Sequence, residues 1–187
     1  MNMIDAIQAI SPVSEESLMK LQEIIEEQTY PRGHTLLNLW QVDRYFHFIV
    51  KGSGRVYYLK DGVDMTDYIA LDGHFLGGVV SLFTGEPSHK AIELMEDSVV
   101  QSLHYPSFEE LCLSYPDLER LFRKIAVFAF LECQQRVESI RFMTASERYA
   151  ELEKKYPGIS NRVPLKHIAS YLGTTPVSLS RIRGGNQ

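Results

Sequence analysis

The stretch that decides the fold is VPLKHIASYLGTTPVSLSRIR, residues 163–183, which has the pattern of two short helices joined by a tight turn. Three apolar residues share one face of the first helix: Ile168, Ala169 and Leu172. Gly173 can adopt the left-handed conformation that ends a helix, and Thr175 followed by Pro176 is typical of the start of the next helix. This spacing predicts a helix-turn-helix, whose second helix enters the major groove of DNA. An ordinary αα-hairpin has the same spacing, so the rest of the chain must decide between the two.

The second helix of this stretch divides into an inner and an outer face. We expect the apolar residues to face the first helix: Val177, Leu179 and Ile182. The outer face then carries hydroxyl and basic side chains: Ser178, Ser180, Arg181 and Arg183. Such side chains donate hydrogen bonds to phosphates and base edges, so the outer face is the expected DNA-contacting side.

Charge is distributed unevenly along the 187 residues, although the net charge is −5. Residues 144–187 carry seven Lys or Arg against three Glu, a local excess of +4. Residues 1–143 carry 12 basic and 21 acidic side chains. An acidic body with a basic tail is typical of a nucleic-acid-binding module attached to another domain.

Composition limits the class of protein. The chain is 44% hydrophobic and 23% charged, as in soluble globular proteins, and no apolar run approaches the roughly 20 residues of a membrane span. The first residues lack the pattern of a secretory signal. Cys112 and Cys133 are the only cysteines, so neither a disulfide framework nor a cysteine-rich metal site is expected. These features favour the cytoplasm.

The segment from Thr29 to His104 has the texture of a β unit. Short runs rich in Val, Ile, Tyr and Phe alternate with glycine-bearing turns, which indicates a sandwich or barrel. The clearest strands are Tyr45–Val50 and Gly54–Leu59. An Asp61-Gly62 turn should lead back to a strand at Tyr68–Leu71. A last pair of strands is expected at Ala91–Leu94 and Val99–His104, on either side of Glu96-Asp97.

Helices are expected on both sides of the β unit. Ser14 can cap a first helix that runs to about Glu27, and Ser107 can cap a short one to about Leu113. A long helix should cover residues 117–143, with an apolar stripe at three- and four-residue steps: Leu118, Leu121, Phe122, Ile125, Phe128, Ala129, Cys133, Val137 and Ile140. The β unit can cover part of this stripe, and a second copy in a parallel dimer the remainder. One helix packed wholly on its own domain is the alternative.

The sequence Thr144-Ala-Ser-Glu147 is a capping box that starts a new helix, so we place a domain boundary near Met143. Residues 1–143 would form a β-roll effector-sensing domain with the long helix, and residues 144–187 the helix-turn-helix domain. The expected fold class is therefore α+β.

The order of these elements resembles the Crp/Fnr family, that of the cyclic AMP receptor protein and the fumarate–nitrate regulator. The most specific piece is Arg162–Arg183, which is similar to a form that recurs in one branch of the family. Tyr45–Tyr57 and Phe75–Gly78 support it. The resemblance implies a cyclic-nucleotide-binding-domain-like jelly roll, a long dimerisation helix and a C-terminal winged-helix or helix-turn-helix domain.

The resemblance also implies partners and DNA-contacting residues. The implied partners are a roughly palindromic DNA operator, a second copy of the chain and RNA polymerase. Arg181 matches the family's base-reading arginine, and arginine on guanine is the commonest specific contact. The full set of expected DNA contacts is Lys166, Thr174, Thr175, Val177, Ser178, Ser180, Arg181 and Arg183. Lys166 and Arg183 are expected on phosphates, although Arg183 could equally be a solvated end-of-helix cation.

The sensor segment departs from the family pattern. In members that bind cyclic nucleotides, a Glu accepts from the ribose and an Arg-Ser/Thr pair holds the phosphate. Here Gly78 stands in place of that Glu, and His89 and Lys90 in place of the pair. We therefore expect that cyclic AMP is not bound in the usual mode, although Lys90 could attract an anion. The candidate effector-binding residues are Gly77, Gly78, Ser88, His89 and Lys90.

Other chemistries find little support. An iron–sulfur sensor needs a cysteine cluster near the N-terminus, and no cysteine precedes Cys112. Haem stays open, because five histidines lie in the β unit: His34, His47, His74, His89 and His104. A metal-binding cupin enzyme would need His-x-His, and a hydrolase Gly-x-Ser-x-Gly; neither occurs. We expect no enzyme, no assigned cofactor or metal, and at most an unidentified small-molecule effector.

These observations predict a homodimeric, sequence-specific transcriptional regulator whose cyclic-nucleotide chemistry has been lost or changed. The alternative is a small-molecule-binding β-roll protein whose helix-turn-helix no longer reads DNA, since only four residues follow Arg183.

Overall fold

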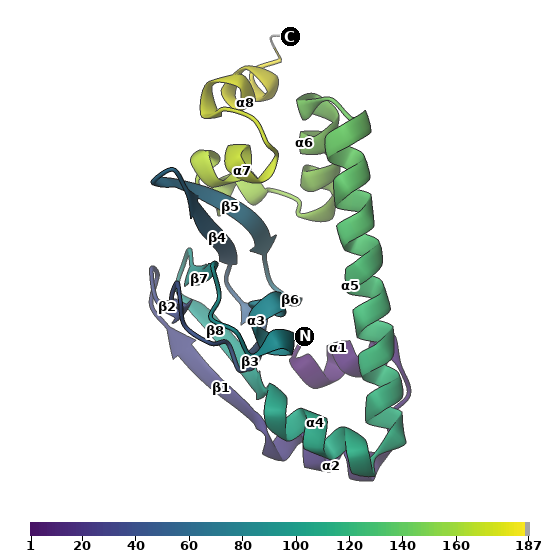
Figure 1. Cartoon of the computed structure of the whole chain (residues 1–187). Helices are drawn as coiled ribbons and strands as arrows, with labels where there is room; N and C mark the ends of the chain where they lie inside the picture. Colours follow the sequence, from purple (N-terminus) through teal and green to yellow (C-terminus); the bar gives the residue numbers. More distant parts are fainter. Residues whose placement is uncertain (186–187) are drawn as a thin grey trace.

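The structure, a computed structural model, describes residues 1–185 and combines a β-roll with eight helices in that range (Figure 1). The last two residues of the expected helix-turn-helix domain lie outside this range. Two helices open the chain: α1 (Met3–Ile10) and α2 (Glu15–Glu23). The strands follow, interrupted by α3 (Val79–Thr84): β1 (Ile25–Tyr30), β2 (Thr35–Leu37), β3 (Tyr45–Lys51), β4 (Gly54–Lys60), β5 (Val63–Ala70), β6 (His74–Leu76), β7 (Ala91–Leu94) and β8 (Ser98–His104). The remainder is helical: α4 (Tyr105–Ser114), α5 (Pro116–Phe142), α6 (Ala145–Lys155), the 3₁₀ turn η1 (Ile159–Asn161), α7 (Leu165–Tyr171) and α8 (Pro176–Arg183).

Two four-stranded antiparallel sheets form the roll, with strand orders β1-β8-β3-β6 and β2-β7-β4-β5. Their inner faces meet in a core built from both sheets: Leu37, Ile49, Val56, Ala70, Leu76, Ile92, Leu94 and Val100. The predicted strands 45–50 and 54–59 are both present. The hairpin at Asp61-Gly62 is also confirmed, since both residues have positive φ, as the primed turns of tight hairpins require.

The structure corrects four details of the sequence interpretation. The helix that was expected to run from Ser14 to about Glu27 is α2, and it ends at Glu23. Glu26 and Glu27 instead belong to β1 and pair with β8. Helix α1 was not expected. The return strand of the hairpin begins at Val63, directly after the turn. Finally, β7 and β8 do not pair with each other, because the chain crosses from one sheet to the other between them.

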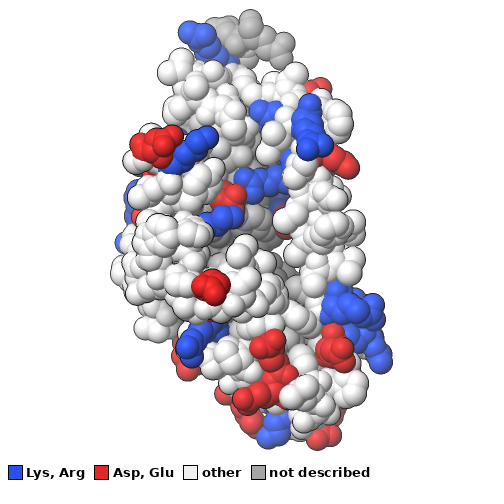
Figure 2. Space-filling view, in the orientation of Figure 1, with Lys and Arg blue, Asp and Glu red and all other residues white. Residues whose placement is uncertain are grey.

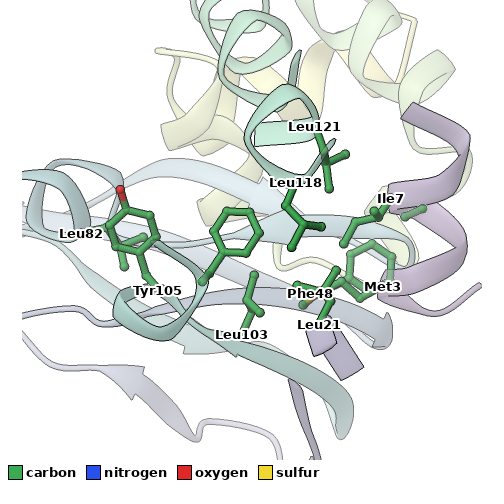
Figure 3. Close-up of a cluster of buried hydrophobic side chains, with 11 residues drawn as sticks. Met3, Ile7, Leu21, Phe48, Leu82, Leu103, Tyr105, Leu118 and Leu121 are labelled. Atoms are coloured by element: carbon green, nitrogen blue, oxygen red, sulfur yellow. The ribbon is translucent and has the colours of Figure 1, made fainter. Parts of the chain in front are cut away.

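Helix α5 is anchored on the roll by its first third (Figure 3). Leu118 and Leu121 are fully buried and pack with Phe48 of β3. Met3 and Ile7 of α1 join the same cluster, so the unexpected first helix closes this end of the core. Asn2 and Asp5 form the capping box that starts α1.

Beyond this apolar anchor, α5 runs the length of the molecule toward α6 and contacts β5 through the Arg136–Asp67 ion pair (Figure 1). Large apolar side chains are exposed along this part: Val127, Phe128, Phe130, Leu131, Val137, Ile140 and Phe142. Phe128 is 57% exposed. The expected stripe is thus covered by the β-roll only at its start, and the described residues do not cover the remainder.

The helices after α5 pack back onto the β-roll instead of standing apart from it. Three roll residues enter their core: Ile69, Leu71 and Met95. The helical side of this core comprises Leu152, Tyr156, Ile159, Val163, Ile168, Ala169, Leu172 and Leu179. The capping box of Thr144 and Glu147 starts α6 as expected. Residues 144–185 contain no strand that could form a wing.

Candidate nucleic-acid interface and sensor pocket

The turn between α7 and α8 has the geometry that its residues predicted. Gly173 adopts φ +65°, where a side chain would strain the backbone. Thr175 caps α8 by accepting a hydrogen bond from the Ser178 N–H at 3.1 Å, and Pro176 is the first helical residue. Leu179 is fully buried between the helices. The two helices therefore form the predicted helix-turn-helix.

Helix α8 turns one face to the outside. Seven of the eight expected DNA contacts are exposed and one, Thr174, is half-buried; the exposed ones are Lys166, Thr175, Val177, Ser178, Ser180, Arg181 and Arg183. Val177 was expected to face α7, and that interpretation is wrong, because it is 63% exposed. At about 100° per residue, two positions place Val177 on the side opposite the buried Leu179.

Charge favours this end of the molecule for contact with a polyanion. Residues 164–185 contain Lys166, Arg181 and Arg183 but no Asp or Glu. On the face shown in Figure 2, acidic atoms gather at the opposite end, where α2 and α4 lie.

Arg162 connects the helix-turn-helix to three turns of the β-roll. Its guanidinium donates to the Glu96 carboxylate at 2.7 Å and to the Gly52 carbonyl oxygen at 2.9 Å. It also forms an ion pair with Asp72. Asp72 in turn accepts the Gly52 N–H at 2.7 Å. Arginine suits this role because its planar fork can serve several acceptors at once.

Helix α7 covers the edge of the second sheet, where β5 is the last strand. The Thr66 N–H donates to the Ser170 hydroxyl oxygen at 2.8 Å. Beneath α7, the buried Arg55 pairs with Asp64 and Glu93.

His167 of α7 lies beside this cluster. Burial, with the charge of Arg55 as a second cause, lowers its pKa to about 4. Its imidazole is therefore neutral at pH 7.

The sensor segment is tightly packed around Gly78. Gly78 is buried, and its N–H donates to the Asp43 carboxylate at 2.6 Å. A Cβ atom at position 78 would lie 2.8 Å from Leu37 Cδ2 and 2.9 Å from Asp43 Oδ2. Asp43 is itself buried, which raises the pKa of its carboxyl. A glutamate at position 78 has no room, because Asp43 and Leu37 occupy the space.

The five candidate effector residues divide into two groups. Gly77, Gly78 and Ser88 are part of the packing and hydrogen bonding of the protein itself. A side chain at either glycine would crowd its neighbours, and Ser88 Oγ accepts the Lys90 N–H at 3.0 Å. His89 and Lys90 instead line an open cavity of about 370 Å³. The structure thus brings only these two candidates together at one hollow.

Four residues of this region were missed by sequence reasoning. Trp40 and Tyr58 line the cavity, Asp67 pairs with Lys90 at 2.6 Å, and Arg136 reaches Asp67 from α5 at 3.4 Å. They come from four separate segments of the chain, and no local motif links them. The one signal was Trp40, the sole tryptophan, which stands in a loop.

Within residues 1–185, no group of three or more His, Cys, Asp or Glu side chains is placed to hold a metal ion. None of the helices described is long and apolar enough to span a bilayer.

A comparison with protein families matches residues 27–115 to the cyclic nucleotide-binding domain. Among curated proteins, the chain is 22% identical over 125 residues to the cyclic nucleotide-gated potassium channel mll3241 of Mesorhizobium japonicum. That match covers 67% of this chain but 33% of the channel, so the chain spans about a third of the length of this relative.

Several solved structures share the fold along most of the chain. FixK2 from Bradyrhizobium japonicum is 20% identical, with a TM-score of 0.72 over 87% of this chain and 84% of FixK2. A protein from Eubacterium rectale described as a Crp/Fnr-family transcriptional regulator is 14% identical, with a TM-score of 0.69 over 91% of this chain and 82% of its own. The chain thus matches the cyclic nucleotide-binding domain over residues 27–115 and shares the fold of these solved structures along most of its length.

Proposed function

We propose that this protein is a sequence-specific, DNA-binding transcriptional regulator. The observation that carries the proposal is α8, which is capped by Thr175, anchored by Leu179 and leaves Arg181, Arg183 and hydroxyl side chains exposed. Basic and hydroxyl groups on the outer face of a second helix are what major-groove readout requires. RNA polymerase is a proposed further partner, and the cytoplasm the proposed place of action.

The proposed active form is a homodimer joined along α5. The exposed apolar side chains between Val127 and Ile140 form more apolar surface than a single exposed helix normally leaves in water. A parallel pair of α5 helices would cover them and place two α8 helices side by side. Two recognition helices related by a two-fold axis match a roughly palindromic operator.

The sensor domain is proposed to respond to a small molecule other than cyclic AMP bound in the usual mode. Position 78 has no room for the ribose-binding glutamate. At position 90, the lysine is already paired with Asp67. Calorimetry of cyclic AMP into the protein tests this point, and micromolar binding that disappears in Lys90→Met would contradict it.

The test of DNA binding is a fluorescence anisotropy titration with the duplex upstream of the protein's own gene, alongside duplexes selected from a random pool. A regulator should bind a selected sequence at least ~1,000-fold more tightly than random duplex at one salt concentration. The logarithm of the affinity should fall linearly with the logarithm of salt concentration. Failure to select any sequence, with or without cell extract, would contradict the proposal.

A second candidate function is a small-molecule-binding β-roll protein that does not read DNA. The observation in its favour is the way that Arg162 and the shared core attach the helix-turn-helix to the β-roll. That candidate predicts ligand binding without selection of any DNA sequence, so the same titration separates the two.

A further inference from the structure

An open cavity of about 370 Å³ lies between the loop that follows β2, the β4–β5 hairpin and the segment before β7. Its volume is at the lower end of the range of small-molecule sites. The lining is mainly aromatic and aliphatic, with one cation: Leu39, Trp40, Tyr58, Leu59, His89 and Lys90. Four of these six residues lie outside the sensor segment that the sequence singled out.

Trp40 is held in the wall of this cavity by a strained backbone. It adopts φ +66°, which is rare for any residue with a bulky side chain, and it is 66% exposed. The Trp40 N–H donates to the Ser88 carbonyl oxygen at 2.7 Å, and the Ser88 N–H donates to that of Gln41 at 2.8 Å. These bonds maintain a conformation that packing alone would not favour, and such strain is concentrated at binding sites. The indole ring meets His89 edge-on, with centroids 4.6 Å apart.

At the edge of the cavity, Lys90 belongs to a charge cluster in which two cations share one carboxylate. Asp67 accepts an ion pair from Lys90 at 2.6 Å and another from Arg136 at 3.4 Å, so one carboxylate serves two cations. Arg136 Nε is buried and has no hydrogen-bond partner among the residues described. Basic and acidic atoms lie together in the hollow between the hairpin and α5 in Figure 2. A second anion is the complement that this cluster lacks.

We propose that the cavity binds a small aromatic carboxylate. Its ring packs against Trp40 and Tyr58, and its carboxylate replaces Asp67 on Lys90. A flat ring suits the aromatic wall, because offset and edge-on ring contacts add to the burial of apolar surface. The negative charge is required by the unequal charges around Asp67. The proposal rests on the proposed function only in regarding the ligand as an effector.

Asp67 also provides a physical route from the cavity to the helix-turn-helix. The register of β4 and β5 shifts at this point: Tyr57 pairs with Thr66 and Val56 with Tyr68, which leaves Asp67 as a bulge. The neighbouring Thr66 N–H is the group that donates to Ser170 of α7. An anion that displaces Asp67 from Lys90 therefore acts on the strand edge to which α7 is attached.

The test uses the fluorescence of Trp40, the only tryptophan, so the signal arises at the site itself. Wild-type protein is titrated with 4-hydroxybenzoate, its neutral analogue 4-hydroxybenzamide, the non-aromatic cyclohexanecarboxylate, and cyclic AMP. We expect saturable binding of 4-hydroxybenzoate and at least tenfold weaker binding of the other three. Calorimetry with the same compounds gives a second measurement of each affinity.

Variants separate the charge of Lys90 from its packing. Lys90→Met should weaken 4-hydroxybenzoate at least tenfold and leave the neutral amide unchanged. Asp67→Asn removes the competing carboxylate and should tighten binding about tenfold. Lys60→Met is the matched control. Lys60 is an exposed lysine at the end of β4, next to the cavity residues Tyr58 and Leu59, but it does not line the cavity. It should not change the affinity.

Several results would overturn the proposal. One is equal affinity for the acid and the amide, and another is tighter binding of cyclic AMP that depends on Lys90. Absence of saturation in both the wild type and a folded Asp67→Asn variant would overturn it as well. These measurements contain no DNA, so they can fail while the DNA titration succeeds. Binding of the acid without any change in DNA affinity would leave the site but refute its role as an effector site.

Discussion

Single glycines and buried carboxylates decide what the sensor segment can hold. Gly78 lies against Leu37 and Asp43, and its missing side chain is a condition for that packing. We predict that Gly78→Ala destabilises the protein by about 1–3 kcal/mol, as overpacking usually does. Gly184→Ala is the matched control, because its Cβ would lie 3.5 Å from the nearest atom and its φ is −75°. Urea unfolding measures both, and equal stability of the two variants would contradict the packing argument.

Buried histidines make stability depend on pH in a defined direction. Burial lowers the pKa of His47 and of His167 to about 4, below the unfolded value near 6.5. The unfolded chain therefore binds more protons between these values, and stability should fall as pH drops from about 6.5 toward 4. A difference of one pKa unit between the folded and the unfolded state corresponds to about 1.4 kcal/mol of folding free energy. Besides burial, the positive charges of Arg55 and Lys166 lower the pKa of His167, whereas the carboxylates of Asp64 and Glu93 raise it.

Urea titrations at several pH values, with NMR titration of the imidazole signals, measure this effect. His167→Gln should flatten the pH dependence while keeping a polar group beside Thr66. Asp43 acts in the opposite sense, because burial raises the pKa of its carboxyl. An imidazole of His167 that titrates near pH 6.5 in the folded protein would refute the explanation.

Two basic residues of the helix-turn-helix should have different effects on DNA binding. Arg181 is exposed near the end of α8, whereas Lys166 is exposed at the start of α7. Arg181→Ala should weaken the binding free energy for the best DNA sequence by about 1–3 kcal/mol and relax the sequence preference at one base pair. Lys166→Ala should weaken all sequences alike and reduce the salt slope by about one. Identical effects in anisotropy titrations would contradict this division of roles.

At the scale of elements, Arg162 connects the η1–α7 segment to three turns of the β-roll. Its removal should lower stability by about 1–3 kcal/mol, because charge-assisted hydrogen bonds are lost and two carboxylates lose their partner. We expect Arg162→Ala to increase hydrogen exchange and protease cleavage around η1. Arg32→Ala is the control, since Arg32 is an exposed arginine beside the same junction. Unchanged exchange in Arg162→Ala would show that the hydrophobic core alone holds the helices.

At the scale of the whole molecule, the uncovered part of α5 predicts the oligomeric state. Phe128→Glu and Leu131→Glu should convert a dimer into a monomer, because each variant buries a charge in the proposed interface. Leu113→Glu, at an exposed position on α4, should leave the dimer intact. Sedimentation velocity measures the mass of each. A wild-type monomer at micromolar concentration would refute the dimer, and weaker DNA binding by the monomeric variants would link it to function.

Much of the local structure follows from signals within a few residues of each other. The Thr175 cap, the left-handed Gly173 and the Asp61-Gly62 turn all follow from such signals. So does the start of α6 at Thr144. Hydrogen bonds and conformational preferences in caps and turns act over about four residues, so a single sequence is sufficient to specify them. The early end of α2 was missed, because the pairing of β1 with β8 determines it, whereas α1 was missed although its Asn2–Asp5 capping box is a local signal.

By itself, the sequence therefore determined the helix-turn-helix and the long helix with its apolar stripe. The tertiary structure alone decided that β7 and β8 belong to different sheets and that α7 covers the edge of β5. It also placed Asp67 between Lys90 and Arg136, 23 and 69 residues away along the chain. The physical reason is the sequence distance over which each interaction acts. The hydrogen bonds of caps and turns are made within one helical turn, whereas strand pairing, burial and shared ion pairs depend on segments that meet only when the whole chain is packed.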